Sequence, residues 1–418
     1  MYTIYLYDQP VGRLVTRGTG IRFTYDVSVL ANNNMPAISL SMPKREEPYG
    51  GKVAKAFFLN LLPEGAYKRL VEQMTGTSAG NDSALLGAIG GECPGAIAIW
   101  PEGQLPPAIL HYEPLTTSDL QQLFDPLNAT AIASATRRAR LSLAGVQEKT
   151  ALYRDDTNNW QRPLDGAITS HILKQPAAAF PHLLENELFC MTLADRAGLN
   201  VAHVGLPAPA VRVFCTERFD RIRSTGAPDA AHPRIKLHQE DFCQVLEVLP
   251  SQKYQDEGGP GLKQCASVLR TFTTLPIEDI TRLLRWVGFN YIVGNEDAHA
   301  KNLALLYLPN SELRLAPHYD LVSTEVYPDL ARGCAMKIGR ATTFSGVQAA
   351  DWKRVAAMLD LPWSAARDEL RALAGQVNQV LVQTQASCSE NFGPAPVYVT
   401  IAALAETRTS RLLADTVR

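Results

Sequence analysis

A short polar segment between two apolar runs constrains the fold of this chain more than any other feature. The run 283–293 leads into the polar segment 294–302, and the run 303–308 has the pattern of a buried strand. Apolar elements on both sides would be buried in a core and would hold the polar segment rigidly between them. We therefore expect residues 294–302 to form a fixed loop that presents polar side chains.

Three polar residues in and after this loop have the types and the order that phosphoryl transfer requires. Asp297 and Asn302 are five positions apart, and Asp320 follows them. In that reaction one carboxylate takes the proton of the acceptor hydroxyl, while an amide oxygen and a second carboxylate hold Mg²⁺ on the nucleotide phosphates. Asp-x-x-x-x-Asn alone is a weak signal, because both residue types are common in turns. The flanking apolar runs favour the kinase interpretation.

A second segment offers backbone groups for a phosphate. Residues 141–153 contain a small-residue turn around Gly145 between two apolar runs. Backbone N–H groups in such a turn can approach a phosphate closely. An ordinary β-turn is the alternative interpretation. Lys149 is then either a surface charge or a phosphate ligand.

Two strand ends extend the nucleotide interpretation. Lys174 ends a predicted strand at 168–174, and a strand lysine is the usual partner of nucleotide phosphates. A second predicted strand at 211–215 runs into Glu217 and Phe219, at the place where a hinge between lobes would fall. The backbone groups of those two residues would be available to the edge of an adenine.

The size and charge of the chain exclude several classes of protein. With 418 residues and 46% hydrophobic content, it can bury a large core and is predicted to divide into two or three domains. A net charge of −2 creates no global attraction to nucleic acid or to a membrane. The seven cysteines are scattered, and we see neither an export signal nor a membrane span. This usage favours a reducing cytoplasm.

Changes of pattern divide the chain into three predicted parts. Residues 1–102 alternate strand and helix patterns and form a small α+β module. A segment rich in proline and glycine separates it from residues 103–222. A connection at 223–235 without a core-forming pattern opens the third part, 223–418, which is largely helical.

A basic cluster at Arg137, Arg138 and Arg140 follows a short predicted helix. Such a cluster is more often the solvated face of a helix than a binding site. We expect the solvated face here.

The ordered motifs resemble those of the HipA toxin kinases of bacterial type II toxin-antitoxin modules, and the resemblance covers essentially the whole chain. Several long motifs in the same order are more specific than any one of them. The matching segments are 60–65, 91–97, 142–152, 170–174, 217–221, 239–244, 297–302 and 319–320.

This resemblance implies a fold of the α+β class that is bilobal and protein-kinase-like. The N-terminal α+β subdomain would be residues 1–102, the small lobe 103–222 and the α-helical large lobe 223–418. The resemblance also implies that ATP and Mg²⁺ are the cofactors.

The same resemblance assigns roles to individual residues. Asp297 would be the catalytic base, Asn302 and Asp320 would bind Mg²⁺, and Ser142 would be the site of autophosphorylation that switches the kinase off. The residues implied for ATP binding are Ala144, Gly145, Val146, Gln147, Glu148, Lys149, Lys174, Glu217, Phe219, His299, Asn302 and Tyr319.

The implied function is that of a serine/threonine protein kinase that acts as a toxin and halts translation, with an aminoacyl-tRNA synthetase as the expected target. The implied partner is a HipB-like helix-turn-helix antitoxin, with which the kinase acts as corepressor and through which it meets DNA. Two alternatives stay open from the residues themselves. One is a small-molecule phosphotransferase, and the other is a catalytically silent nucleotide-binding scaffold in a repressor complex.

Overall fold

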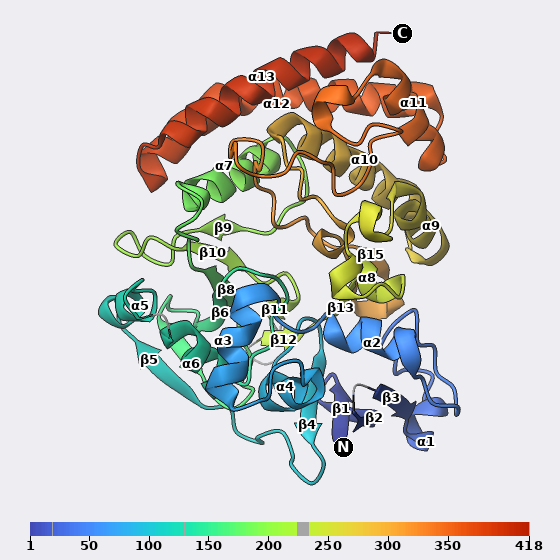
Figure 1. Cartoon of the computed structure of the whole chain (residues 1–418), viewed down its shortest axis with the longest axis vertical. Helices are drawn as coiled ribbons and strands as arrows, with labels where there is room; N and C mark the ends of the chain where they lie inside the picture. Colours follow the sequence, from blue (N-terminus) through green and yellow to red (C-terminus); the bar gives the residue numbers. More distant parts are fainter. Residues whose placement is uncertain (19, 129, 224–233, 418) are drawn as a thin grey trace. The chain divides into compact units, whose positions relative to one another are not determined.

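The computed structural model describes residues 1–18, 20–128, 130–223 and 234–417, so most of the predicted connection at 223–235 lies outside the described residues (Figure 1). The chain folds into two compact units. Unit 1 comprises Met1–Gln175, Leu206–Pro250 and Leu306–Leu308, and unit 2 comprises Pro176–Gly205, Ser251–Leu305 and Pro309–Arg418. The predicted boundaries near residues 102 and 222 stay predictions.

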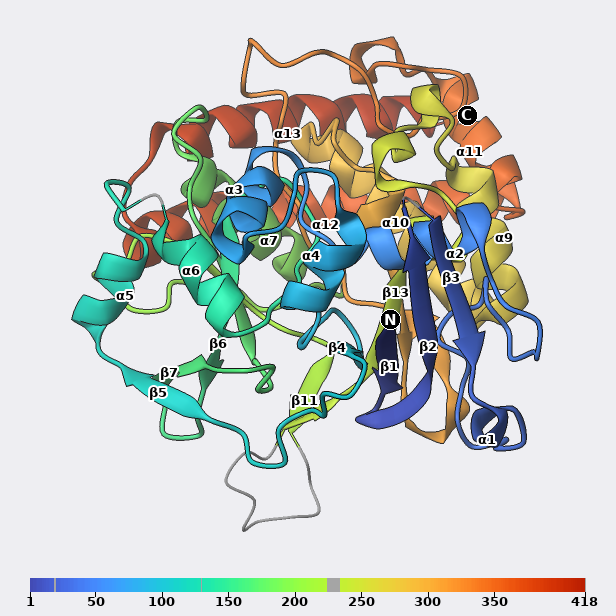
Figure 2. The same cartoon turned by 60° about the horizontal axis from the view of Figure 1, so that its bottom comes forward.

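An antiparallel four-stranded sheet opens unit 1, and its strands β1, β2 and β3 lie side by side in Figure 2. The sheet has the order β3-β2-β1-β4 and places alternate side chains of β3, including Phe23, in the core. The first two strands form an antiparallel hairpin, in which Tyr2 of β1 pairs with Leu14 of β2. The strands are β1 (Tyr2–Leu6), β2 (Gln9–Arg17), β3 (Gly20–Tyr25) and β4 (Ile97–Pro101).

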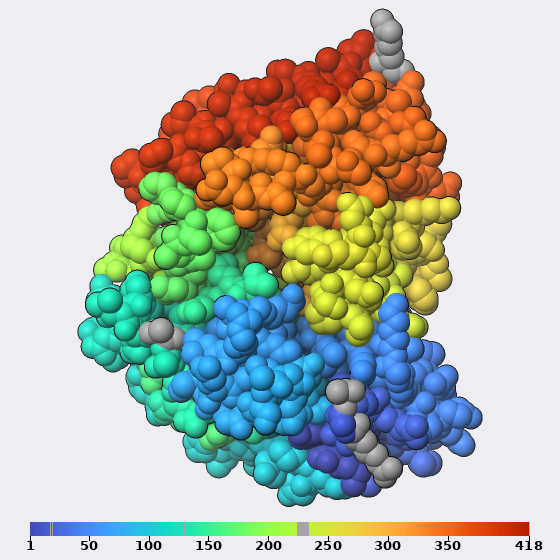
Figure 3. All heavy atoms as spheres, in the orientation of Figure 1, coloured from blue at the N-terminus to red at the C-terminus, as the bar shows by residue number. Residues whose placement is uncertain are grey.

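Four helices accompany this sheet in the described part of unit 1. Apolar positions recur at helical spacing on both sides of Pro63, and they form two helices because proline and glycine interrupt the helix between them. Atoms of residues 51–89 form an outer surface of the unit, blue in Figure 3. The helices are α1 (Val27–Leu30), α2 (Gly51–Leu59), α3 (Gly65–Thr75) and α4 (Asp82–Ile89).

A second sheet in unit 1 carries the predicted nucleotide segments. Its strands follow the order β5-β7-β6-β8-β10. The predicted strand at 168–174 begins only at His171, because the N–H and the hydroxyl of Thr169 donate to the carboxylate of Glu92 and not to a neighbouring strand. The elements are β5 (Tyr112–Leu115), α5 (Thr117–Leu123), α6 (Ala131–Arg138), β6 (Lys149–Arg154), β7 (Trp160–Pro163), β8 (His171–Lys174), β10 (Phe214–Glu217), β11 (Arg221–Arg223), β12 (Arg234–Lys236), β13 (His238–Asp241) and α8 (Phe242–Val245).

Unit 2 is mainly helical. Its core contains the apolar run at 283–293, which the structure makes the second half of one continuous helix, α10. Figure 1 shows α12 and α13 side by side, and both contact α10. The elements are α7 (Leu183–Arg196), β9 (Val204–Gly205), α9 (Leu262–Phe272), α10 (Pro276–Val293), β14 (Ala304–Tyr307, ending in unit 1), β15 (Leu313–Leu315), α11 (Ala349–Met358), α12 (Trp363–Phe392) and α13 (Pro396–Asp415).

The mixture of helix and sheet, with a helical C-terminal part, confirms the predicted α+β class. Among the residues that the structure describes, no helix combines the length and the apolar character that crossing a membrane would require.

Four largely buried histidines make the stability of the fold sensitive to acid. Burial lowers the pKa of His171, His238 and His299 to about 4 and that of His318 to about 3. The unfolded chain therefore binds more protons below pH 6.5, and the stability present above that pH is lost as the pH falls toward 4. Burial raises the pKa of Glu240 to about 7, which opposes this trend because protonation favours its folded form.

We expect the free energy of unfolding to fall by several kcal/mol between pH 7 and pH 5, since each histidine contributes on the order of 2 kcal/mol at pH 5. Urea unfolding at a series of pH values measures this. His238→Gln should reduce the loss, whereas the same change at the exposed His111 should not. A stability that is constant between pH 7 and pH 5 would contradict the expectation.

Candidate active site

The helix α10 leads into the predicted catalytic loop, and the helix ends at Gly294. Gly294 adopts a left-handed conformation with φ of 72°, and its N–H donates to the carbonyl of Asn290. The chain then turns, so that Asn295 donates to Asn290 through both its backbone N–H, at 2.9 Å, and its side-chain amide, at 2.7 Å. The C-terminus of a buried helix therefore fixes where the loop begins.

Gly294→Ala should destabilise the protein by about 1–3 kcal/mol, because a side chain would need positive φ and would crowd its neighbours. A Cβ atom at this position would lie 2.8 Å from side-chain atoms of Glu325 and Leu404. Urea unfolding measures the change. Gly375→Ala is the control, since that glycine lies within α12 with open space around its Cβ position, and alanine there should be neutral or stabilising. Equal losses from both variants would refute the explanation.

Backbone hydrogen bonds bring Asp297 and Asn302 together. The carbonyl of Asp297 accepts from the N–H of His299 at 2.9 Å and from Nδ2 of Asn302 at 3.2 Å, and the carbonyl of His299 in turn accepts from the N–H of Asn302 at 2.9 Å. With Nδ2 occupied in this way, Oδ1 is the atom of Asn302 that can serve as a ligand. The hydroxyl of Tyr254 donates to Oδ1 of Asp297 at 2.8 Å and so orients the carboxylate.

His299 is close enough to both predicted carboxylates for their charges to act on its pKa. Burial lowers its pKa to about 4, although the nearby charges of Asp297 and Asp320 act to raise it. The imidazole is therefore neutral at pH 7. Its Nδ1 atom is buried without a hydrogen-bond partner among the described residues, which leaves one polar atom for a ligand.

Contacts on both sides fix the segment that carries Asp320. The N–H of His318 donates to the carbonyl of Asn200 at 2.8 Å, and the hydroxyl of Tyr319 donates to the carbonyl of Lys301 at 2.7 Å. Asp320 itself adopts a left-handed conformation with φ of 59°, which aspartate tolerates better than most residues. Unit 2 therefore brings Asp297, His299, Asn302, Tyr319 and Asp320 into one site.

The predicted phosphate loop of unit 1 closes on itself. Gly145 has a φ of 105°, and Nζ of Lys149 donates to the carbonyl of Ala144 at 2.8 Å. This positive φ favours glycine, and a Cβ atom on residue 145 would also displace that Nζ, which would lie 2.5 Å away. At the other end of the turn, Gln147 donates to the carbonyl of Gln175 at 2.6 Å. In this conformation the side chain of Lys149 stabilises the turn through its hydrogen bond to Ala144.

The other predicted nucleotide residues of unit 1 lie on neighbouring strands. Lys174 on β8 is buried and pairs in register with Lys149 on one side and Phe214 on the other. Its Nζ lies 5.0 Å from the centroid of the Phe214 ring. Glu217 ends β10, and its carboxylate pairs with Arg234 at 3.1 Å. Phe219 follows two residues later, between the buried Arg218 and Asp220.

Ser142 is fully buried in this conformation. Its hydroxyl donates to the carbonyl of Leu61 at 2.7 Å, and its N–H donates to the carbonyl of Glu92 at 2.9 Å. The hydroxyl therefore cannot receive a phosphoryl group until the segment that carries it leaves this position.

Comparison with known proteins decides the family. Residues 2–100 match the family model of the HipA N-terminal domain, and residues 141–382 match that of the HipA-like C-terminal domain. This chain belongs to the HipA family. The C-terminal match contains every predicted site residue, from Ser142 to Asp320.

Two relatives match most of the chain. Y4mE of Sinorhizobium fredii is 39% identical over 356 residues, which cover 82% of this chain and 83% of Y4mE. The serine/threonine-protein kinase toxin HipA of Shewanella oneidensis is 30% identical over 339 residues, which cover 78% of this chain and 76% of that protein.

A solved structure confirms the predicted HipA-like fold. It is a chain from the complex of Shewanella oneidensis HipA and HipB with their operator DNA, and it matches with a TM-score of 0.80 at 26% identity. The match covers 100% of this chain and 96% of that chain.

The donor set in unit 2 is chemically suited to Mg²⁺, the ion that the resemblance to HipA kinases implies. Oxygen atoms of a carboxylate and an amide are the protein ligands that Mg²⁺ prefers, and Asp320 and Asn302 supply them. Nδ1 of His299, in the same loop as Asn302, has no hydrogen-bond partner among the described residues.

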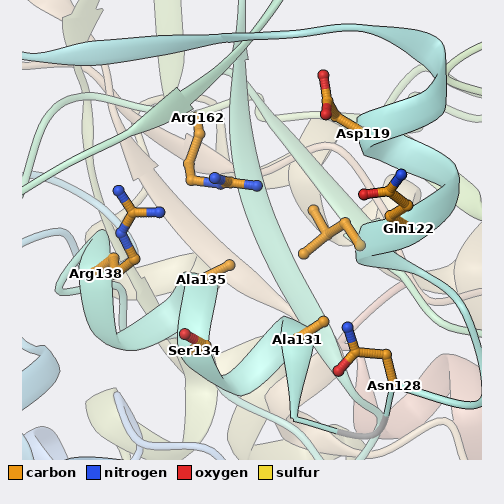
Figure 4. A pocket seen from close by; sticks show the side chains of 9 residues that line it. Asp119, Gln122, Asn128, Ala131, Ser134, Ala135, Arg138 and Arg162 are labelled. Atoms are coloured by element: carbon orange, nitrogen blue, oxygen red, sulfur yellow. The ribbon is translucent and has the colours of Figure 1, made fainter.

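A hollow of about 230 Å³ in unit 1 lies apart from the predicted site residues (Figure 4). Arg138 and Arg162 lie on its wall and share the carboxylate of Glu113, at 2.5 and 3.1 Å. The arginine cluster is thus only partly the solvated face that we predicted. Arg137 and Arg138 are exposed, whereas the guanidinium of Arg140 lies 4.3 Å from the centroid of the Trp100 ring.

Sequence reasoning missed two residues that support the site. Tyr254 orients Asp297 from a segment far away in the sequence, and no local pattern pointed to it. Glu92 accepts the N–H of Ser142 through its backbone and several further donors through its carboxylate. It lies in the resembling segment 91–97, which could have drawn attention to it.

Proposed function

We propose that this chain is an ATP- and Mg²⁺-dependent serine/threonine protein kinase and the toxin of a type II toxin-antitoxin module. The observation that carries the proposal is the proximity of these groups in unit 2: Asn302 is hydrogen-bonded to Asp297, and the charges of Asp297 and Asp320 both act on the neutral His299. Membership of the HipA family supports it, as does the description of the Shewanella oneidensis relative as a serine/threonine-protein kinase toxin.

Each residue of the arrangement has a separate task. Asp297, oriented by Tyr254, accepts the proton of the attacking hydroxyl. Oδ1 of Asn302 and the carboxylate of Asp320 would hold Mg²⁺, which neutralises charge on the transferred phosphate. Neutral His299 can donate or accept a hydrogen bond toward the nucleotide without adding charge.

The residues of unit 1 have the complementary task of binding ATP. Ala144, Gly145, Val146, Gln147, Glu148 and Lys149 form the turn that would cover the phosphates. Lys174 would contact phosphate oxygens, and Glu217 and Phe219 would hold the adenine through their backbone groups. In this scheme residues 1–102 form the N-terminal module, 103–222 the small lobe and 223–418 the large lobe.

Autophosphorylation of Ser142 would switch the enzyme off. Since its hydroxyl is buried against Leu61, the segment must move out before it can be phosphorylated. A phosphate adds a charge of about −1.5 to −2, which cannot return to a buried position without a large desolvation penalty. The modified loop would therefore stay displaced from the nucleotide.

The proposed target and partner of this kinase are those that membership of the HipA family suggests. A translation-related protein, such as an aminoacyl-tRNA synthetase, is the proposed target, and the cytoplasm is the proposed location. A HipB-like helix-turn-helix antitoxin is the proposed partner, with which the kinase would act as corepressor, because the structural relative was solved with HipB and operator DNA. The near-neutral charge of this chain agrees with DNA contact that is made mainly through such a partner.

Incubation of the purified chain with γ-labelled ATP and Mg²⁺ tests the activity. Label on Ser142, identified by mass spectrometry and absent in Ser142→Ala, is expected. Label that appears only on added small metabolites would instead identify a small-molecule phosphotransferase. ATP binding without any transfer would identify a silent scaffold.

A further inference from the structure

Glu92 touches the start of the phosphate loop through its backbone. It lies in unit 1 between α4 and β4 and is fully buried. Its N–H donates to the carbonyl of Arg140 at 3.0 Å, and its carbonyl accepts the N–H of Ser142 at 2.9 Å. These two bonds form a parallel bridge around Leu141, directly before the turn that contains Gly145.

The carboxylate of Glu92 holds the strand that carries Lys174. Its Oε1 atom accepts from both the N–H and the hydroxyl of Thr169, each at 3.1 Å. Thr169 is fully buried and directly precedes Ser170 and β8. The position of β8 therefore depends on Glu92 as well as on its neighbouring strands.

The same oxygen holds the segment around Glu217 and Phe219. It accepts from Nη1 of Arg218 at 3.3 Å and from Nε and Nη2 of Arg221 at 3.1 and 2.9 Å. Both guanidinium groups also donate to the carbonyl of Cys93, at 3.1 and 2.9 Å.

Asp220 completes the charge balance of this cluster. It pairs with Arg218 at 2.8 Å and accepts the N–H of Gly95 at 2.7 Å. Burial acts to raise its pKa, but Arg218 and Arg221 lower that pKa far below its ordinary value, so the carboxylate is ionised. Two buried arginines thus face two buried carboxylates, and Lys236 lies at the margin, 3.7 Å from Glu92. Loss of either carboxylate would leave a buried cation without its partner.

The geometry points to Glu92 as a positioning residue for nucleotide binding, an inference that rests on the proposed kinase function. Glu92 is buried behind the segments that would contact ATP, so it acts through them. It links the phosphate loop, the Lys174 strand and the Glu217–Phe219 segment to one turn of the N-terminal module. This role also explains why the segment 217–221 contains Arg218, Asp220 and Arg221, for which nucleotide binding has no use.

Glu92→Gln in the full-length chain tests this role. The change keeps the shape of the side chain but removes the charge that holds Arg218 and Arg221. The dissociation constant for ATP should rise by about tenfold or more, because small displacements of binding groups have large effects on affinity and rate. Isothermal titration with Mg-ATP, at a temperature where both proteins are folded by circular dichroism, measures the change.

Asp279→Asn is the matched control. Asp279 is also a fully buried carboxylate held by two arginines, Arg282 at 3.1 Å and Arg314 at 3.0 Å, but it lies in unit 2 on α10. The Asp279→Asn variant should lower the unfolding temperature about as much as Glu92→Gln does. Its affinity for ATP should stay within about twofold of the wild-type value. An equal loss of ATP affinity in both variants would mean that general destabilisation causes the loss. That result would overturn the inference.

A pair of variants at Thr169 gives a second test in case Glu92→Gln fails to fold. Thr169→Val removes only the hydroxyl that joins Glu92 and Arg218, whereas Thr169→Ser keeps it. ATP affinity should fall by about threefold in the valine variant and stay unchanged in the serine variant. Unchanged affinity in the valine variant would refute the inference. A wild-type chain that does not bind ATP would refute the proposed function itself.

Discussion

Replacing Asp297 with asparagine should lower phosphoryl transfer by about 10²–10⁴-fold, the range that general-base catalysis supplies. Asparagine has the same shape as aspartate and can still accept the hydrogen bond from Tyr254, so the loop should keep its conformation. It cannot take a proton from the attacking hydroxyl. Initial rates of label transfer from γ-labelled ATP, with Mg-ATP saturating, measure the effect.

Asp256→Asn is the control for the loss of a carboxylate elsewhere in unit 2. Asp256 forms an exposed ion pair with Lys337 at 2.7 Å, and its replacement should leave the rate within about twofold. Binding of Mg-ATP should survive in the Asp297 variant, since the metal ligands are intact. Full activity in that variant would remove Asp297 from the mechanism, however well the rest of the site binds nucleotide.

Asp320→Asn should raise the Mg²⁺ concentration needed for half-maximal activity by about tenfold or more and lower the maximal rate by about 100-fold. An amide oxygen is a weaker ligand than a carboxylate for a hard cation, and it leaves the phosphate charge less well balanced. Titration of the rate with Mg²⁺ at fixed ATP separates the two effects. Asparagine tolerates the left-handed conformation at φ of 59°, so folding should not be affected.

Asp360 offers a control with the same backbone conformation. It has a φ of 54°, and its carboxylate is mostly exposed and pairs with Arg270 at 3.4 Å. Asp360→Asn should change neither the Mg²⁺ requirement nor the maximal rate. An Asp320 variant with the wild-type Mg²⁺ dependence would show that the metal, if one is used, is held elsewhere.

Local sequence patterns predicted much of the fold, because the spacing of apolar residues within a short segment depends on the element that this segment forms. The third part of the chain, predicted to be largely helical, contains helices such as α11, whose apolar spacing and termini lie within one short segment. The loop at 294–302 follows from the apolar runs on both sides. The apolar run at 283–293 indicated only the second part of α10, because that helix begins at Pro276.

Long-range contacts decided what the local patterns could not. The strand predicted at 168–174 starts three residues late because Thr169 is hydrogen-bonded to Glu92, a residue from a different part of the chain. Three neighbouring arginines were predicted to share one solvated face. Arg137 and Arg138 are exposed, whereas the guanidinium of Arg140 lies against the Trp100 ring. A local pattern contains no information about such surroundings.

The sequence by itself determined which residues could perform phosphoryl transfer, because residue type, order and spacing set the available chemistry. Only the tertiary structure decided how those residues are held. It placed the hydroxyl of Tyr254 on Asp297, His299 within the influence of two carboxylates, Ser142 in a buried position and Glu92 in an ionic cluster. Each of these contacts joins segments that are distant in sequence or depends on burial. Long-range contacts and burial arise only when the whole chain packs.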